Sequence, residues 1–368
     1  MKNLVILGAG TAGTMMANHL VKKLNKKDWQ ITLVDQFKSH YYQPGFLFIP
    51  FGTYQPEDVK RTIDEFLPKG IQLIREKIDR IDKDTDTVIL ENGRNVKYDI
   101  LIIATGCKIA PEEVPGMKGD TWQKNIFDFY TFEGSCALAK KLETWPGGKL
   151  VVHITEMPIK CPVAPLEFAF LADDYFTKKG MRDKVEISYV TPLSGAFTKE
   201  KCTKALEYLL KDKNIKIVPD FAVEHIEGEN GKMFDYGGEV VDFDLLVTVP
   251  TNMGDECILR SGFGDDLNYV PTDKNTLQSK VKENIFVIGD ATNVPASKAG
   301  SVAHFEAEIL TENILKYIEG KPLNPKFDGH ANCFIETGKG KALLIDFNYD
   351  VEPLKGKFPF AGIGPLNL

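Results

Sequence analysis

The stretch LVILGAGTAG, Leu4–Gly13, decides the fold of this chain. Four apolar residues predict a buried strand, and Gly8, Gly10 and Gly13 follow it in G-x-G-x-x-G register. The first glycine permits a tight turn, the second lets the backbone approach a pyrophosphate, and the third lets a helix pack closely on the strand. The sequence therefore predicts a β-α-β unit that binds a dinucleotide.

The residues after the glycines continue this unit. Met16, Leu20 and Leu24 recur at i, i+4 and i+8, which predicts a helix whose N-terminus offers free N–H groups to phosphates. The next strand, ITLVD, ends in Asp35, at about the 20-residue spacing from Gly13 that suits an acid bonded to ribose hydroxyls.

Two later stretches indicate which dinucleotide is bound. YDILIIATG, Tyr98–Gly106, and ENIFVIGDATN, Glu283–Asn293, each predict a buried strand ending in a small-residue turn, and a helix is predicted from near Ser301. This order of motifs resembles the two-dinucleotide-domain flavoproteins, which implies FAD. The resemblance implies that Asp290 binds the ribityl chain and that the following helix N-terminus faces the pyrimidine edge of the flavin, where negative charge gathers on reduction. Lys298 either reinforces that stabilisation or is an ordinary surface lysine.

The resemblance implies a full set of cofactor-binding residues, drawn from the glycine turn, the strand ends and the helix starts. They are Gly8, Gly10, Thr11, Ala12, Gly13, Asp35, Gln43, Pro44, Ala104, Thr105, Gly106, Gly289, Asp290, Lys298, Ala299 and Gly300. Gln43 and Pro44 belong to HYYQPGFLF, which resembles the loop that packs a proline against the flavin side of the cofactor.

A second alternating stretch runs from about Gly147 to Pro250. It predicts strands at KLVVHI, VEISYVT, IKIVP and LLVTVP, and helices over 165–179 and 199–211. Flavoproteins that use NAD(P)H carry a second glycine motif after the first of these strands. Here TEMPIKCPVAP, Thr155–Pro165, contains no glycine. Because such a backbone cannot cradle a pyrophosphate closely, we expect the nicotinamide site to be lost and the electron donor to be something else.

The sequence predicts an α/β fold of two Rossmann-like domains with a C-terminal α+β module. We expect residues 1–146 and 251–320 to form the FAD-binding domain, 147–250 the second Rossmann-like domain carrying the redox cysteine, and 321–368 the C-terminal quinone-side module. In that module NCFIET and KALLIDFNY predict a hairpin around Gly338–Lys339–Gly340.

Two of the six cysteines stand in unusual places. Cys161 replaces the nucleotide loop of the second unit, and Cys333 begins a C-terminal strand. The stretches CPVAPLEFAF, IIATG, GDATNVPASKAGSVAHFEA and NCFIETGKGKALLIDFNYD resemble the sulfide:quinone oxidoreductase family and the related flavoprotein subunit of flavocytochrome c sulfide dehydrogenase. The resemblance implies that Cys161 and Cys333 form a redox-active pair near the flavin, while Glu167 either manages protons or is a solvated or N-terminal helix glutamate. The other cysteines are expected to be buried and apolar in role, although Cys107 follows the ATG turn and could instead approach the cofactor: Cys107, Cys136, Cys202 and Cys257.

The chemistry implied by the resemblance begins with a disulfide or a persulfide bridge. Hydrosulfide attacks one sulfur, which leaves a persulfide on that cysteine and a thiolate on the other. The flavin then accepts two electrons and passes them to a quinone, with sulfane sulfur or polysulfide as product. Aromatic residues of the C-terminal module could line the quinone site, although a hairpin core explains Phe334 and Phe347 equally well: Phe334, Phe347, Tyr349, Phe358 and Phe360.

The sequence also departs from the family. NIFDFYTF lacks the third reactive cysteine that many members carry. The chain stops at FPFAGIGPLNL, so we expect the amphipathic helices that attach members to the membrane to be either missing or truncated. Three other functions stay open. They are a sulfide dehydrogenase that reduces a cytochrome, an NAD(P)H-dependent flavoprotein, and a sulfur-sensing flavoprotein without turnover.

Composition limits the remaining possibilities. A formal net charge of -7 argues against a nucleic-acid partner. Neither C-x-x-C nor paired Cys/His spacing occurs, so we expect no metal site. No cleavable signal peptide and no apolar run of transmembrane length is apparent, which predicts a peripheral membrane or cytoplasmic protein, and a homo-oligomer is possible.

Overall fold

Each of two units is assembled from three stretches of the chain in the computed structural model, which describes residues 1–198 and 200–351. The first unit contains Met1–Tyr41, Lys60–Lys108 and Met253–Ala331. The second contains Tyr42–Val59, Ile109–Asn252 and the described residues from 332 onward. These units divide the chain differently from the four sequence ranges given above, which stay a prediction of domains.

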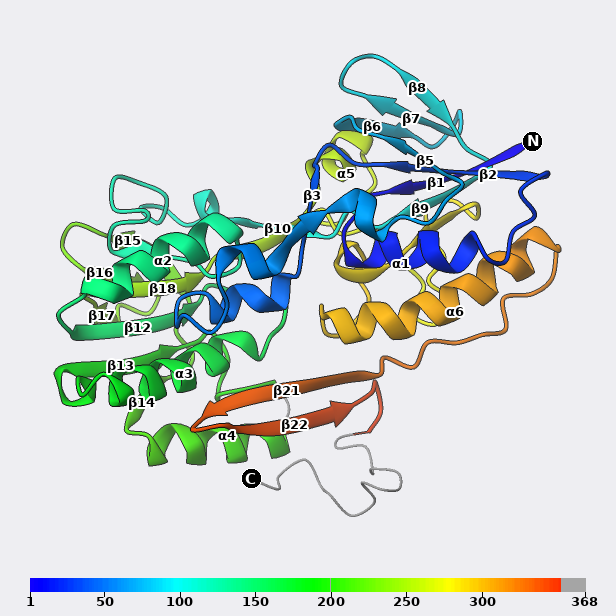
Figure 1. The fold of residues 1–368 in the computed structure, drawn as a ribbon. Helices are drawn as coiled ribbons and strands as arrows, with labels where there is room; N and C mark the ends of the chain where they lie inside the picture. The colour runs from blue at the N-terminus through cyan, green and yellow to red at the C-terminus, as the bar shows by residue number, and fades with distance from the viewer. Residues whose placement is uncertain (199, 352–368) are drawn as a thin grey trace. The chain divides into compact units, whose positions relative to one another are not determined.

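A five-stranded parallel sheet forms the centre of the first unit (Figure 1). In order across the sheet, its strands are β20 (Ile285–Val287), β9 (Ile100–Ile103), β1 (Lys2–Leu7), β2 (Trp29–Val34) and β5 (Ile71–Ile74). The strand of the opening motif is therefore the central one, and Leu4–Leu7 are fully buried. Such strands are apolar on both faces because both faces of a parallel sheet are covered.

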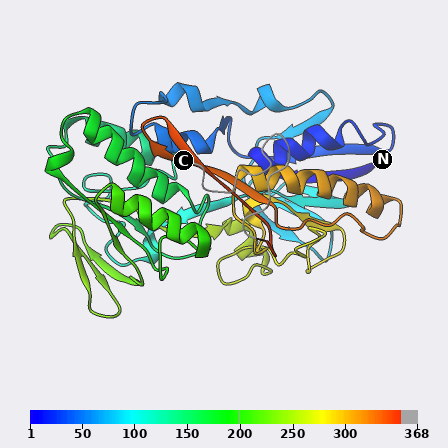
Figure 2. The same ribbon diagram turned by 90° about the horizontal axis from the view of Figure 1, so that it is seen from below.

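Two helices of this unit lie side by side, α1 (Thr11–Leu20) and α6 (Gly300–Ile318), as Figures 1 and 2 show. Because α1 ends at Leu20, the prediction that Leu24 continues its apolar stripe is wrong. After Leu20 the chain tightens into a turn, in which the Lys22 N–H donates to the His19 carbonyl at 3.3 Å and the Lys23 N–H to the Leu20 carbonyl at 3.0 Å.

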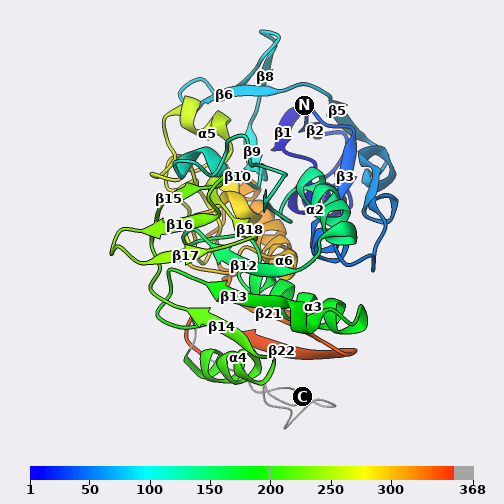
Figure 3. The same ribbon diagram turned by 90° about the vertical axis from the view of Figure 1, so that its left-hand side faces the viewer.

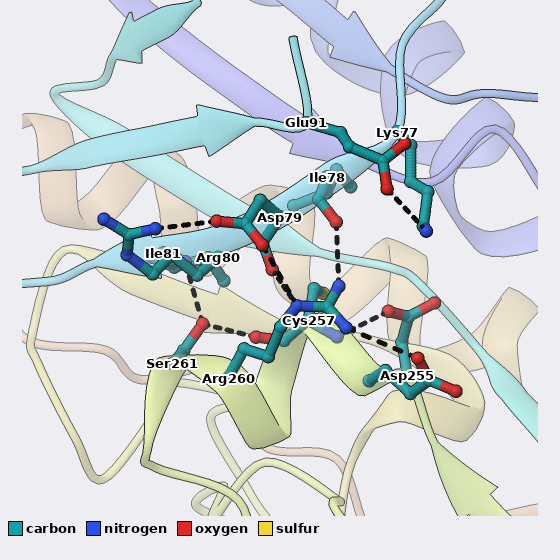
Figure 4. A network of polar contacts seen from close by, with 11 residues as sticks. Lys77, Ile78, Asp79, Arg80, Ile81, Glu91, Asp255, Cys257, Arg260 and Ser261 are labelled. Carbon is teal, nitrogen blue, oxygen red and sulfur yellow. Dashed lines mark hydrogen bonds and ion pairs between the residues drawn. The ribbon is translucent and has the colours of Figure 1, made fainter. Parts of the chain in front are cut away.

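Shorter elements complete the first unit. They are the antiparallel strands β6 (Ile78–Asp82), β7 (Thr87–Leu90) and β8 (Asn95–Lys97), the pair β3 (Ser39–Tyr41) and β4 (Lys60–Thr62), and the 3-10 turns η3 (Ile63–Phe66) and η6 (Gly289–Ala291). The helix α5 (Glu256–Ser261) packs on β6 (Figure 4). Arg260 Nε donates to the Asp79 carbonyl at 2.7 Å, and Ser261 Oγ accepts a backbone N–H of β6 at 2.8 Å. This packing buries Cys257, as expected from the sequence.

The second unit contains another five-stranded parallel sheet (Figure 3). In order across the sheet, its strands are β11 (Ile126–Phe127), β18 (Leu245–Val249), β12 (Gly148–Ile154), β13 (Val185–Val190) and β14 (Ile215–Val218). Its helices are α2 (Phe132–Thr144), α3 (Ala164–Lys178) and α4 (Glu200–Asp212). The strands and helices predicted for this stretch are present within two residues of their expected places. The two parallel sheets confirm an α/β fold with two Rossmann-like domains.

The remaining elements of the second unit include the predicted C-terminal hairpin, which is confirmed as β21 (Ala331–Gly338) and β22 (Lys341–Phe347). The others are β15 (Val223–Glu227), β16 (Lys232–Asp235), β17 (Val240–Asp242), η1 (Gln43–Phe48), η2 (Pro56–Val59), η4 (Pro111–Glu113) and η5 (Arg182–Lys184). Where the chain crosses between units, β10 (Cys107–Ala110) pairs with β19 (Thr251–Gly254). Within the described residues, no helix combines the length and the apolar character needed to cross a membrane.

Candidate active site

The predicted dinucleotide turn lies at the carboxyl ends of parallel strands in the first unit. Gly8 follows β1, the turn beginning at Ala104 follows β9, and Gly289 follows β20, so the three turns meet at one edge. A Cβ placed on Gly8 would lie 2.5 Å from the Ala104 carbonyl oxygen, and one on Gly13 would lie 1.9 Å from the Gly8 carbonyl oxygen. Backbone therefore packs directly on backbone, which only glycine permits at these two positions.

The same edge offers an open cradle with polar groups around it. A Cβ on Gly10 would meet no atom within 4 Å. The Thr105 hydroxyl oxygen is buried without a hydrogen-bond partner in the described structure. Asp35 accepts the Ala9 N–H at 2.6 Å and the Phe37 N–H at 2.7 Å, and burial raises its pKa. Space beside Gly10, an unsatisfied hydroxyl and an anchored carboxylate are what a pyrophosphate and a ribose would complete, so these residues fit FAD.

The other predicted contacts of this unit stand at helix starts. Thr11 and Gly300 are the first residues of α1 and α6, and Ala12 and Ala299 adjoin them. Backbone N–H groups in the first turn of a helix have no partner within it, which suits anionic groups.

Lys298 is buried, so the surface-lysine alternative is wrong. Its side chain is 6% exposed, and Nζ donates to the carbonyl oxygens of Asp290 at 3.0 Å and Thr292 at 2.7 Å. Nζ also lies 3.8 Å from the centre of the Tyr269 ring. Burial lowers the pKa of Lys298, and the charge of Asp290 opposes this effect. Lys298 thus holds the turn after β20 in shape, while its role toward the flavin stays a prediction.

Gln43 and Pro44 belong to η1 in the second unit. Gln43 Oε1 accepts a hydrogen bond from Lys160 Nζ at 3.0 Å. This bond links η1 to the residue before Cys161, and the contact of Pro44 with the flavin stays a prediction.

Cys161 occupies a strained turn before α3. Its φ of 42° lies in the left-handed region, which costs a residue with a Cβ about 1 kcal/mol or more. Its carbonyl oxygen accepts the Ala164 N–H at 2.9 Å and the Tyr130 hydroxyl at 3.1 Å. The turn is further held by the Asn252 side chain, which accepts the Lys160 N–H at 3.0 Å. The half-buried Cys161 is therefore fixed in a conformation that surrounding groups maintain.

Glu167 lies in the same unit as Cys333, and the two interact. The Glu167 side chain is 6% exposed, and Oε1 accepts the Glu336 N–H of β21 at 3.0 Å. Burial raises the pKa of Glu167 to about 7. The hydrogen bond from the Glu336 N–H opposes this rise, and the negative charge of Glu336 adds to it. Burial raises the pKa of Cys333 to about 12, and the negative charge of Glu167 adds to the effect. Glu167 is therefore not solvated, while its place in the first turn of α3 agrees with the alternative of an N-terminal helix glutamate.

The aromatic residues proposed for a quinone site differ in environment. Phe334 on β21 is 69% exposed, whereas Phe347 on β22 is 7% exposed and belongs to the core. A hairpin-core role is therefore right for Phe347 and wrong for Phe334. Tyr349 is half-buried, and Phe358 and Phe360 lie outside the described residues.

All six cysteines lie in the described part of the chain, and none of them forms a disulfide there. Cys202 is buried, as expected, while Cys136 and Cys107 are only partly buried. Cys107 Sγ lies 3.8 Å from Asp290 Oδ2. Among the described residues, no group of three or more His, Cys, Asp and Glu side chains could hold a metal ion.

Sequence reasoning missed Glu306 on α6. Its side chain is 1% exposed, and Oε2 accepts the Gly289 N–H at 2.6 Å. The signal was present in AHFEAEIL, because a carboxylate falls between Val302 and Leu310 on the buried stripe of the helix.

The fold and the glycine turn define the class of this protein, which is a flavoprotein oxidoreductase that binds FAD in a Rossmann-like domain. Residues 2–152 match the family described as pyridine nucleotide-disulphide oxidoreductase.

Over almost its whole length, the chain is similar to flavoproteins named as quinone oxidoreductases. The chain is 28% identical over 357 residues to the mitochondrial sulfide:quinone oxidoreductase of Dictyostelium discoideum, covering 95% of this chain and 78% of that protein. It is 28% identical over 385 residues to the type II NADH:quinone oxidoreductase of Staphylococcus aureus, covering 97% and 92%. The solved sulfide:quinone oxidoreductase of Aquifex aeolicus shares the fold, with a TM-score of 0.80, 24% identity, and coverage of 95% and 84%. These similarities confirm the resemblance to the sulfide:quinone oxidoreductase family that was stated from the sequence.

Proposed function

We propose that this protein oxidises sulfide through Cys161 and Cys333 and passes the electrons from FAD to a membrane quinone, with sulfane sulfur as product. The observation that carries the proposal is the 3.0 Å hydrogen bond from the Glu336 N–H to Glu167. This bond joins α3, which follows Cys161, to β21, which contains Cys333. Membrane attachment and homo-oligomer formation stay predictions.

The run of β21 along α3 supports a pairing of the two cysteines. Glu336 meets Glu167, and two residues later a Cβ on Gly338 would lie 2.9 Å from Asp174 Cβ. Strand and helix therefore run in the same direction. Stepping back from Glu336 to Cys333 covers about 10 Å of strand, because a strand rises about 3.3 Å per residue.

The same distance along a helix, at about 1.5 Å per residue, corresponds to six or seven residues. Going back from Glu167, three residues lie in α3, which begins at Ala164, and the turn before it leads to Cys161, six residues from Glu167. We infer from this that Cys161 and Cys333 can form a disulfide, which is the state that the proposed chemistry requires.

The proposed reaction balances with two hydrosulfide ions. The first breaks the Cys161–Cys333 bond and forms a new sulfur–sulfur bond, giving one persulfide and one thiolate. A second hydrosulfide removes the sulfane sulfur as the shortest polysulfide, so that both cysteines become thiols or thiolates. When FAD is bound, it supplies the two-electron acceptor that restores the disulfide, and it is reoxidised by the quinone.

Glu167 suits proton transfer in this cycle. Its pKa of about 7 allows it to be either neutral or charged near neutral pH. Because it faces the Cys333 side of the pair, it can accept the thiol proton before the disulfide reforms. A carboxylate in water, with a much lower pKa, would be a weaker base for this step.

The cysteine pair is tested by an anaerobic absorbance titration of the FAD-loaded protein with sulfide. We expect Cys161→Ser and Cys333→Ser each to retain FAD and to lose sulfide-dependent bleaching of the flavin band. The matched control is Cys136→Ser, because Cys136 lies in the same unit on α2 and should bleach like the unmodified protein. An active Cys161→Ser protein would overturn the mechanism.

Electron donor and acceptor are tested in the same titration. Bleaching by sulfide, with recovery on adding a short-chain quinone, supports the proposal. Bleaching without recovery points instead to a cytochrome partner or a sulfur sensor. Bleaching by NADH alone would place the activity with the type II NADH:quinone oxidoreductases, which the chain also resembles.

A further inference from the structure

A carboxyl group lies directly behind the turn that the FAD-binding edge requires. Glu306 projects from α6, and its Oε2 accepts the Gly289 N–H at 2.6 Å. With 1% of the side chain exposed, solvent cannot stabilise its charge. Gly289 adjoins Asp290, the residue that the family resemblance assigns to the ribityl chain of FAD.

Few charged groups face this carboxyl. Asp290 from η6 adds negative charge, and Lys298 adds positive charge from the following loop. Lys298 Nζ is already committed to two carbonyl oxygens, at 3.0 and 2.7 Å. From α1, which packs along α6, the titratable residue is His19, which contacts Thr311 at 3.2 Å, more than a helical turn beyond Glu306.

We propose that Glu306 takes up a proton when the bound FAD is reduced, and so offsets the negative charge that the reduced flavin carries. The flavin itself gains two electrons and one proton. The Glu306 carboxylate takes up one proton from solvent and becomes a carboxylic acid. The two-electron reduction thus binds two protons in all, one on the flavin and one on Glu306. The cause is electrostatic, because new negative charge nearby raises the pKa of a carboxyl group.

The resting state of Glu306 is suited to this role. Burial raises its pKa to about 8, while the Gly289 N–H opposes the rise, the charge of Asp290 adds to it and that of Lys298 opposes it. Near that pH the carboxyl is partly ionised in the oxidised protein, so a further rise in its pKa on reduction binds a proton. Below that pH it is already neutral and no second proton is expected.

The test is a dye-mediated redox titration of the FAD-loaded protein with dithionite, followed by flavin absorbance. The slope of the midpoint potential against pH gives the number of protons taken up per two electrons. We expect this number to rise from about one near pH 7 to about two near pH 9, and to stay at one in Glu306→Gln. The control Glu308→Gln removes an exposed carboxyl from the same helix and should keep the rise. Equal slopes in the unmodified protein and Glu306→Gln would overturn the proposal.

A second measurement covers the case in which Glu306→Gln fails to bind FAD. Infrared difference spectra between oxidised and reduced protein can be recorded with ¹³C-labelled glutamate, on a Glu167→Gln background that removes the other glutamate buried in the described part of the chain. We expect an isotope-sensitive carboxylic acid band to appear on reduction at about pH 9, and its absence would overturn the proposal. The inference rests on FAD binding, and neither sulfide nor quinone enters these tests, so its failure would leave the proposed function standing.

Discussion

At the scale of single residues, Glu167 and Cys333 influence each other's protonation. Burial raises the pKa of Glu167 to about 7 and, together with the charge of Glu167, that of Cys333 to about 12. A thiol with so high a pKa is a poor nucleophile, because the thiolate is the reactive form. Below about pH 7 the carboxyl is neutral and its contribution to the Cys333 pKa disappears.

Replacing Glu167 by Gln should therefore lower the pKa of Cys333. Above pH 7 we expect Cys333 to be alkylated faster in Glu167→Gln than in the unmodified protein, by about tenfold for each pKa unit removed. Below pH 7 the two rates should converge, because Glu167 is then protonated. Iodoacetamide labelling with peptide mass spectrometry measures this, and Glu143→Gln, an exposed charge on α2, is the control. Equal rates above pH 7 would show that the two groups do not interact.

At the scale of elements, two glycines in the turn between β1 and α1 are expected to serve different purposes, close packing at one position and ligand access at the other. Gly13 is needed for packing, because a Cβ there would lie 1.9 Å from the Gly8 carbonyl oxygen. Gly10 is needed for access, because a Cβ there would meet no protein atom and would project into space that a pyrophosphate can use. The G-x-G-x-x-G pattern predicted both uses. The close packing of Gly13 is present in the structure, and the access of a pyrophosphate beside Gly10 stays a prediction.

Alanine at these positions should separate the two effects. We expect Gly13→Ala to lower the free energy of unfolding by about 2 kcal/mol or more and to lose FAD, because helix and strand must move apart. Gly10→Ala should cost less than about 1 kcal/mol, as a cap change does, yet bind FAD weakly. Thermal unfolding of the apoprotein and flavin fluorescence quenching measure the two quantities. Equal destabilisation by both substitutions would contradict this division of roles.

At the scale of the whole molecule, periodicity predicted most of the fold, because parallel strands buried on both faces stand out as apolar runs. The partners of Glu167 and Lys298 could not be predicted, since their burial depends on residues that only the fold brings to them. Glu167 is covered by β21, about 170 residues later in the chain. For the same reason, the sequence did not predict that residues 42–59 belong to the second unit. Nor did it predict that the turn after β20 covers Glu306.

The two parallel sheets also predict a difference in how the two units respond to dinucleotides. FAD should protect backbone amides from hydrogen exchange at the strand ends of the first unit, above all in residues 8–14, 104–106 and 289–291. NADH added to the FAD-loaded protein should leave exchange in residues 155–163 unchanged, because the loop after β12 lacks the glycines that let a backbone approach a pyrophosphate. Exchange measured by mass spectrometry with and without NADH tests this. Protection of 155–163 by NADH would mean that Cys161 stands within a working nucleotide site, and the electron donor would then have to be reassigned.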